Sequence, residues 1–76
     1  MSKEKIFNII SKTLSINIKN IDINTNSDNT KQWDSLATTN IIVALEEGFD
    51  IDIDLDDAEK FVSVEAIIKI IEGTYI

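Results

Sequence analysis

Apolar residues recur at helical spacing at the start of the chain. Over residues 2–15 they are Ile6, Ile9, Ile10 and Leu14, and Ile9, Ile10 and Leu14 each lie three or four positions after another of them. This spacing places an apolar stripe along one side of a helix. Ser2 suits the cap of such a helix, and Glu4 stands where the helix dipole favours an anion. The pattern predicts a helix over residues 2–15.

The same spacing returns over residues 35–49 and again after Ser63. The stripe of residues 35–49 consists of Thr38, Ile41, Ile42, Leu45 and Phe49. The stripe after Ser63, which suits a helix cap, consists of Val64, Ile67, Ile68 and Ile71. Gly48 stands in the last turn of the earlier helix, and Gly73 is expected to end the later one. A short helix of one or two turns is expected over residues 56–61.

Residues 16–32 lack this spacing. Their isoleucines alternate only loosely with polar residues, at Ile16, Ile18, Ile21 and Ile23. A strand here would have no partner in an otherwise helical chain, so we expect a long loop that these isoleucines pin to the bundle. Loops of this length often carry function. The predicted fold class is all-α: one domain over residues 1–76, a small bundle of three main helices and one short helix, with the long loop between the first two.

Charge divides the chain into two unlike parts. Residues 1–33 hold five lysines and three acids, whereas residues 34–76 hold eleven acids and two lysines, for a net charge of −7. Without arginine or a cationic cluster, nucleic acid is not an expected partner. No apolar run approaches the ~20 residues of a membrane span and no signal-peptide pattern is found, so we expect a cytoplasmic protein without membrane insertion.

The outer face of the second predicted helix combines apolar and acidic residues. At about 100° per residue, the side opposite the core stripe holds Leu36, Asn40, Val43 and Glu47, with Glu46 at its flank. This composition suits docking of an apolar and basic partner. Single exposed apolar residues are also normal on protein surfaces, so both interpretations stand.

Ser35 stands at the first turn of that helix, beside the same outer face. Unpaired N–H groups and the dipole make a helix amino end suitable for an attached phosphate. Alternatively, Ser35 or Asp34 is an ordinary N-cap.

The run WDSLATTNIIVALEEGFDIDI resembles the acyl carrier proteins. In that family Asp-Ser-Leu opens the second helix, the serine carries a phosphopantetheine arm, and an LEE-x-F pattern closes the helix. The similarity continues through AEKF, residues 58–61, and SVEAIIKII, residues 63–71, and so spans nearly the whole chain.

The resemblance implies that Ser35 is the attachment site of 4′-phosphopantetheine, whose thiol would hold acyl groups because the chain has no Cys. It implies a monomeric carrier rather than an enzyme. Its partners would be a phosphopantetheinyl transferase and acyl-loading and acyl-transferring enzymes. The residues that would meet them are Asp34, Leu36, Val43, Glu46 and Glu47. Those that would surround a buried acyl chain include Leu45, Ile53, Ile67 and Ile68.

Several positions depart from the common fatty-acid-synthesis pattern. Ala37 and Asn40 stand where acids are usual, Lys31-Gln32-Trp33 replaces a segment with Gly, and Asp54-Leu55 lacks a Pro. A docking helix two acids poorer would bind basic patches more weakly, which indicates a specialised carrier. Trp33 either packs the loop onto the bundle or shapes partner choice.

Two further interpretations remain open. Asp50, Asp52 and Asp54 match positions 1, 3 and 5 of a calcium loop, but Leu55 and Phe61 occupy the positions that need Gly and Glu. A divalent-cation-binding protein is therefore the weaker alternative. An acidic helical interaction module without a cofactor would share the same fold and charge. An enzyme is not expected, since there is no His or Cys.

Overall fold

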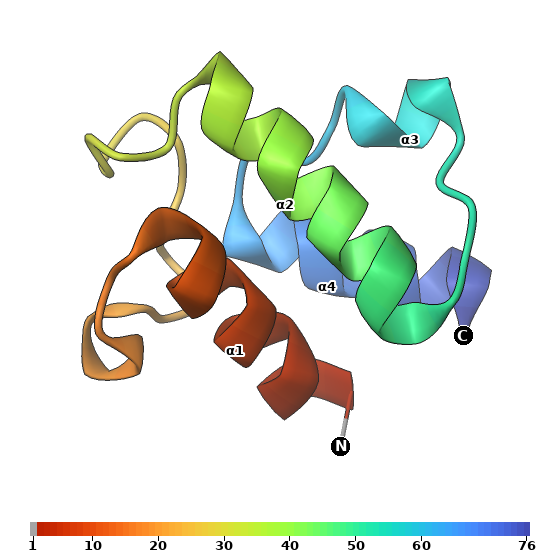
Figure 1. Ribbon diagram of the computed structural model, residues 1–76, viewed down its shortest axis with the longest axis horizontal. Helices are drawn as coiled ribbons and strands as arrows, with labels where there is room; N and C mark the ends of the chain where they lie inside the picture. Colours follow the sequence, from red (N-terminus) through yellow and green to blue (C-terminus); the bar gives the residue numbers. More distant parts are fainter. Residues whose placement is uncertain (1) are drawn as a thin grey trace.

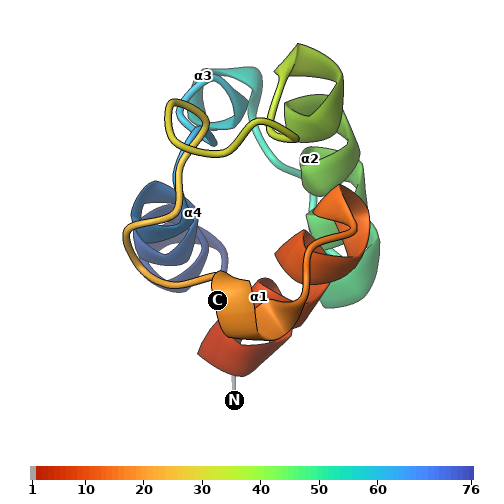
Figure 2. The ribbon, with the colours of Figure 1, turned by 90° about the vertical axis from the view of Figure 1, so that its left-hand side faces the viewer.

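Over residues 2–76, the part of the chain that the computed structural model describes, four α-helices surround one core (Figures 1 and 2). They are α1 (Ser2–Leu14), α2 (Ser35–Phe49), α3 (Leu55–Ala58) and α4 (Val64–Ile70). A 3-10 turn, η1 (Ile18–Asn20), follows α1, and a π-helical turn, η2 (Ile71–Tyr75), follows α4. The predicted all-α bundle of three main helices and one short helix is confirmed.

α1 and α2 pack side by side and run in opposite directions (Figure 1). Gly48 makes their close approach feasible, because a Cβ at this position would lie only 2.8 Å from Ile9 Cδ1. The Lys5 ammonium lies 4.7 Å from the centre of the Phe49 ring, a cation–π contact between the two helices. The glycine of α2 therefore serves helix packing.

The core is built from the stripes that the sequence predicts. Eight side chains are almost completely buried: Ile6, Ile10, Ile41, Leu45, Phe61, Val64, Ile67 and Ile71. Phe61 is the largest of them and lies between α3 and α4 in the sequence. Such close packing of aliphatic groups supplies most of the stability of a small domain.

The long loop is held only in part as expected. Ile21 is buried and Ile16 half-buried, but Ile18 and Ile23 are 42% and 44% exposed and do not pin the loop. Ile16 and Ile21 hold the loop as expected. Backbone hydrogen bonds add to them: Ser27 N–H donates to Val62 O (2.8 Å), and Val64 N–H donates to Thr25 O (2.9 Å). Asn and Asp side chains close the turns of the loop. For example, Asp22 Oδ1 accepts from Asn24 N–H, and Asn26 Oδ1 accepts from Asp28 N–H.

α2 ends at Phe49 as predicted, whereas α3 and the last helix differ from the prediction. The left-handed residue that ends α2 is Asp50, with φ 56°, and Ser15, with φ 57°, follows α1. Gly73 does not end the last helix, because the chain continues through it in η2 and neither glycine has a positive φ. α3 begins at Leu55 and ends at Ala58, earlier than the predicted residues 56–61.

Candidate functional site

Asp34 caps α2. Its backbone is extended (φ −98°, ψ −172°), and its Oδ1 accepts a hydrogen bond from Ala37 N–H at 2.8 Å. The α-helix begins at the next residue, Ser35. Of the two candidates for the cap, the structure therefore selects Asp34, and the Ser35 hydroxyl is not used for capping.

Ser35 is exposed in the first turn of α2, and its neighbour Leu36 is 70% exposed. Within residues 2–76, the Ser35 hydroxyl forms no hydrogen bond with another side chain or with the backbone. Only the Ser35 carbonyl is engaged, accepting from Thr39 Oγ1 at 3.2 Å. An exposed hydroxyl at a helix amino end, beside N–H groups without helical partners, fits an attached phosphodiester.

Trp33 packs the end of the long loop onto the bundle, which answers the question left by the sequence. Its side chain is 2% exposed and belongs to the hydrophobic core. The indole N–H donates to Thr38 Oγ1 at 3.0 Å, and that hydroxyl donates to Asp34 O at 3.2 Å. Sequence reasoning placed Thr38 only on the apolar stripe. The signal that it missed was a hydroxyl residue five positions after Trp33, within reach of the indole N–H.

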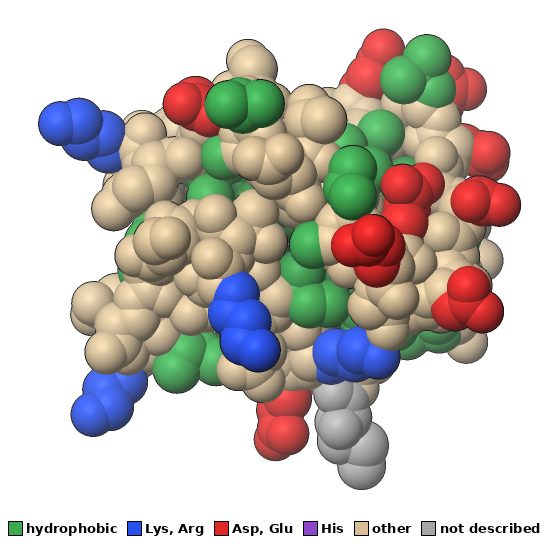
Figure 3. Space-filling model, in the orientation of Figure 1, with side chains coloured by type: hydrophobic (Ala, Val, Ile, Leu, Met, Phe, Trp, Pro, Cys, Tyr) green, Lys and Arg blue, Asp and Glu red, His purple; other side chains and the backbone are tan. Residues whose placement is uncertain are grey.

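The outer face of α2 is as the sequence predicts. Leu36 and Val43 are 70% and 47% exposed, and Asn40 and Glu47 are exposed beside them. The opposite side is buried through Ala37, Ile41 and Leu45. The exposed apolar side chains are thus bordered by polar and acidic ones, and Figure 3 shows hydrophobic and acidic side chains together on this side of the molecule.

Glu46 is engaged within the chain. It is half-buried, and its Oε2 accepts a hydrogen bond from Ile53 N–H at 2.9 Å. This bond ties the segment after α2 back to the helix. Sequence reasoning placed Glu46 at the flank of the outer face and missed the bond, because the partner is a backbone group seven residues later.

Acidic residues gather at one end of the molecule. In Figure 3 most Asp and Glu side chains lie over α3 and the C-terminal end of α2, whereas lysines lie over α1 and the long loop. Leu55, 77% exposed, stands among the acids of α3. It was not among the predicted docking residues, although its position between Asp54 and Asp56 marked it as a surface residue.

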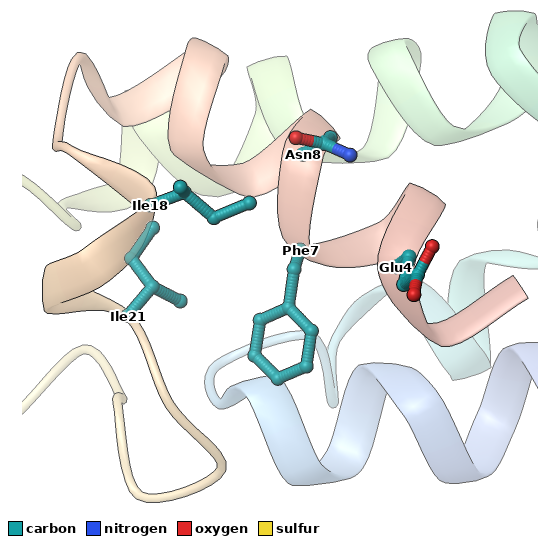
Figure 4. A pocket seen from close by; sticks show the side chains of 5 residues that line it. All are labelled: Glu4, Phe7, Asn8, Ile18 and Ile21. Carbon is teal, nitrogen blue, oxygen red and sulfur yellow. The ribbon is translucent and has the colours of Figure 1, made fainter. Parts of the chain in front are cut away.

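The residues assigned to a buried acyl chain lie in or against the core. Leu45, Ile67 and Ile68 are buried, and Ile53 is half-buried and packs against them. A separate cavity of about 360 Å³ lies beside α1 and η1, lined by Glu4, Phe7, Asn8, Ile18 and Ile21 (Figure 4). None of these five is a residue assigned to the acyl chain.

The calcium interpretation depends on convergence of several carboxylates. Among the residues that the structure describes, no three His, Cys, Asp or Glu side chains come together as metal ligands would. Asp50, Asp52 and Asp54 therefore do not form such a group.

No helix within residues 2–76 has the length and apolar character needed to cross a membrane.

Comparison with known proteins agrees with this geometry. Residues 4–71 match the family described as "Phosphopantetheine attachment site". An acyl carrier protein of Prochlorococcus marinus is 36% identical over 70 residues, which cover 92% of this chain and 88% of that protein. An acyl carrier protein of Desulforapulum autotrophicum is 55% identical over 38 residues, covering 50% of this chain and 49% of that protein. The chain therefore belongs to the acyl carrier protein family, whose cofactor is phosphopantetheine.

Proposed function

We propose that Ser35 carries the phosphopantetheine arm, and that the protein holds acyl intermediates on it as thioesters for the enzymes of a fatty-acid, polyketide or other specialised biosynthetic pathway. One observation carries this proposal. The Ser35 hydroxyl is exposed and unbonded within residues 2–76, because Asp34 caps α2 in its place. A serine needed as the cap would have its oxygen occupied by a backbone N–H.

The chemistry divides between the cofactor and the chain. Acyl carrier proteins are carriers and not enzymes, and the thiol that holds the acyl group belongs to the cofactor. This chain has no Cys of its own. What the chain supplies is a fixed attachment oxygen, the positive amino end of α2 beside the phosphodiester, and a face for partner enzymes.

We assign the docking of partners to the outer face of α2. Its members are Asp34, Leu36, Val43, Glu46 and Glu47. Exposure of the two apolar residues supports this assignment. Glu46 contributes only the part of its carboxylate that the Ile53 N–H does not use. The net charge of −7 opposes self-association and attracts basic surfaces, so we propose a monomer whose partners, including a transferase, present such surfaces. We also propose that the protein is cytoplasmic.

The departures from the common pattern affect this face less than the sequence suggested. Ala37 is 9% exposed and lies on the core side of α2, so it removes no acid from the docking face. Asn40 is exposed and does replace an acid there. The face is thus poorer by one negative charge and not two. This one-charge difference supports the proposal of a specialised carrier, whose partners would be adapted to it.

The test is modification of the protein by coenzyme A and a broad-specificity phosphopantetheinyl transferase, followed by intact mass. We expect a gain of one phosphopantetheine group, absent in Ser35→Ala and retained in Ser27→Ala, a matched control in the long loop. Circular dichroism of each variant checks folding. If the folded protein gains no mass with several transferases, the acidic interaction module without a cofactor becomes the better interpretation.

A further inference from the structure

The start of α2 is fixed by contacts that Ser35 itself does not make. Trp33, two residues before it, is 2% exposed, and its backbone N–H donates to Thr30 O at 3.0 Å. The indole N–H reaches forward along the helix to Thr38 Oγ1, at 3.0 Å. A core side chain is thus connected to the first turn of the helix by a directed hydrogen bond.

Thr38 in turn forms hydrogen bonds to the peptide group that precedes Ser35. Its hydroxyl accepts from the indole and donates to Asp34 O at 3.2 Å, and its backbone N–H donates to the same oxygen at 2.9 Å. A hydroxyl bonded on both sides has little freedom to rotate. The Asp34 carbonyl therefore receives two donors from one residue, and its direction is fixed.

This carbonyl belongs to the peptide group that joins Asp34 to Ser35. The planar peptide fixes the N–Cα bond of Ser35, and the helical φ of Ser35 in α2 then sets the direction of its Cα–Cβ bond. The Ser35 hydroxyl has no hydrogen bond of its own within residues 2–76. Its placement therefore depends on the backbone and on rotation about the Cα–Cβ bond.

We propose that Trp33 and Thr38 are positioning residues for the modification of Ser35, an inference that rests on the proposed function. In that step the Ser35 Oγ–phosphorus bond forms and the diphosphate P–O bond of coenzyme A breaks. Adenosine 3′,5′-bisphosphate leaves, and the hydroxyl proton passes to the transferase. Such a displacement depends strongly on the direction of the attacking oxygen. The indole–Thr38–Asp34 chain of hydrogen bonds holds the backbone from which that oxygen projects.

The decisive variant is Thr38→Val, which keeps the branched shape and removes the hydroxyl. Thr38→Ser restores the hydroxyl. Thr39→Val is the matched control, because it removes a hydroxyl that bonds to the Ser35 carbonyl and not to Trp33 or Asp34. Each variant is modified with coenzyme A and one transferase, and kcat and KM are obtained by intact mass. The indole N–H resonance reports whether the Trp33 bond is present, and thermal unfolding ensures that only folded samples are compared.

For Thr38→Val we expect kcat to fall about fivefold to tenfold with KM nearly unchanged, because orientation is lost while the docking face is intact. Thr38→Ser and Thr39→Val should stay within about twofold of the unmodified sequence. If Thr38→Val does not fold, Trp33→Phe, which removes the indole N–H and keeps an aromatic ring, should show the same loss in kcat.

Two results would overturn the inference, and they differ. Wild-type kcat in Thr38→Val, with the indole resonance shifted, would show that the bond is broken without effect on Ser35. That result would leave the proposed function intact. Failure of the unsubstituted protein to be modified would overturn both this inference and the proposed function.

Discussion

Two segments of the protein are held in opposite ways: the start of α2, residues 33–38, and the α3 segment, residues 53–60. At the start of α2, Trp33 and Ala37 are buried, and the cap bond of Asp34 is complete. In α3 no residue is fully buried, Leu55 is 77% exposed, and the N-cap Asp54 makes no side-chain cap bond. The first segment is therefore fixed by the core, and the second is not.

The α3 segment depends on a few hydrogen bonds from remote parts of the chain. Tyr75 in η2 supplies two of them: its hydroxyl donates to Asp57 Oδ2 at 2.6 Å and accepts from Asp54 N–H at 2.8 Å. Glu46 supplies another to Ile53 N–H. Ile53 packs against the core only in part, and the next fully buried side chain is that of Phe61, after α3.

This difference suits a carrier. Segments with few buried contacts and exposed hydrogen bonds open at lower free energy than the core. The attachment point that we propose, Ser35, thus lies in a firmly held segment. The α3 segment, in contrast, is weakly held. The following changes test how large that contrast is.

The largest contrast should come from truncating one residue of the core and one of α3. Phe61→Ala removes a fully buried ring and should cost about 3–5 kcal/mol in the free energy of unfolding. A domain of this size has only roughly that much stability, so most of this variant should be unfolded. Leu55→Ala should cost no more than about 0.5 kcal/mol. Urea unfolding followed by circular dichroism measures both, and a comparable loss at Leu55 would show that α3 is held by apolar contacts.

The two helix caps offer a second, smaller contrast. Asp34→Ala removes a side-chain cap bond and should cost about 1 kcal/mol of stability. Asp54→Ala is the control of the same chemistry at a cap without such a bond and should cost less than half of that. Equal losses in urea unfolding would mean that the Asp34 bond does not distinguish the two helix starts.

The sequence predicts the first of these segments better than the second. The helical spacing of α1, α2 and α4 is a local pattern, so their existence follows from it directly. The cap of α2 could not be assigned, because Asp and Ser cap equally well and only the extended backbone of Asp34 decides between them. Ser35 itself was identified from its place at the helix start and from the resemblance to the family.

The contacts of the α3 segment could not be predicted. The bond of Tyr75 to Asp57 joins residues 18 positions apart, and only the path of the chain brings them together. The exposure of Ile18 and Ile23 was missed for a related reason, since apolar residues in a loop follow no period that would separate inside from outside. Gly73 was expected to end α4, but the helical backbone passes through it without a positive φ.

A smaller and local effect is expected from Glu46→Ala. It removes the acceptor of Ile53 N–H, so the exchange rate of that amide should rise about threefold, or more if the segment detaches. The increase should extend toward α3 and should not reach the start of α2. Glu47→Ala, next to it on the exposed face, is the matched control. Hydrogen exchange measured by NMR tests this, and protection unchanged at Ile53 would show that other contacts hold the segment.

The smallest effect should appear only at alkaline pH. The hydrogen bond to Asp57, followed by desolvation and the charge of the nearby carboxylates, raises the pKa of Tyr75 above its ordinary value of 10.0. The folded protein therefore retains the proton more firmly than the unfolded chain. The resulting stability is complete below pH 10 and is lost as the pH rises from 10 through the higher pKa of the folded state.

Tyr75 is the only tyrosine of the chain, so its ionisation can be followed directly by ultraviolet absorbance. Tyr75→Phe removes the titrating group and controls for the lysines, which also lose their charge in this range. Between pH 9 and pH 11 the unsubstituted protein should lose more thermal stability than Tyr75→Phe. Parallel stability curves for the two proteins, or an absorbance midpoint at the ordinary value, would contradict the Asp57 bond. A steeper loss in the unsubstituted protein, with faster exchange confined to the α3 segment, would identify this bond as one of the contacts that hold α3.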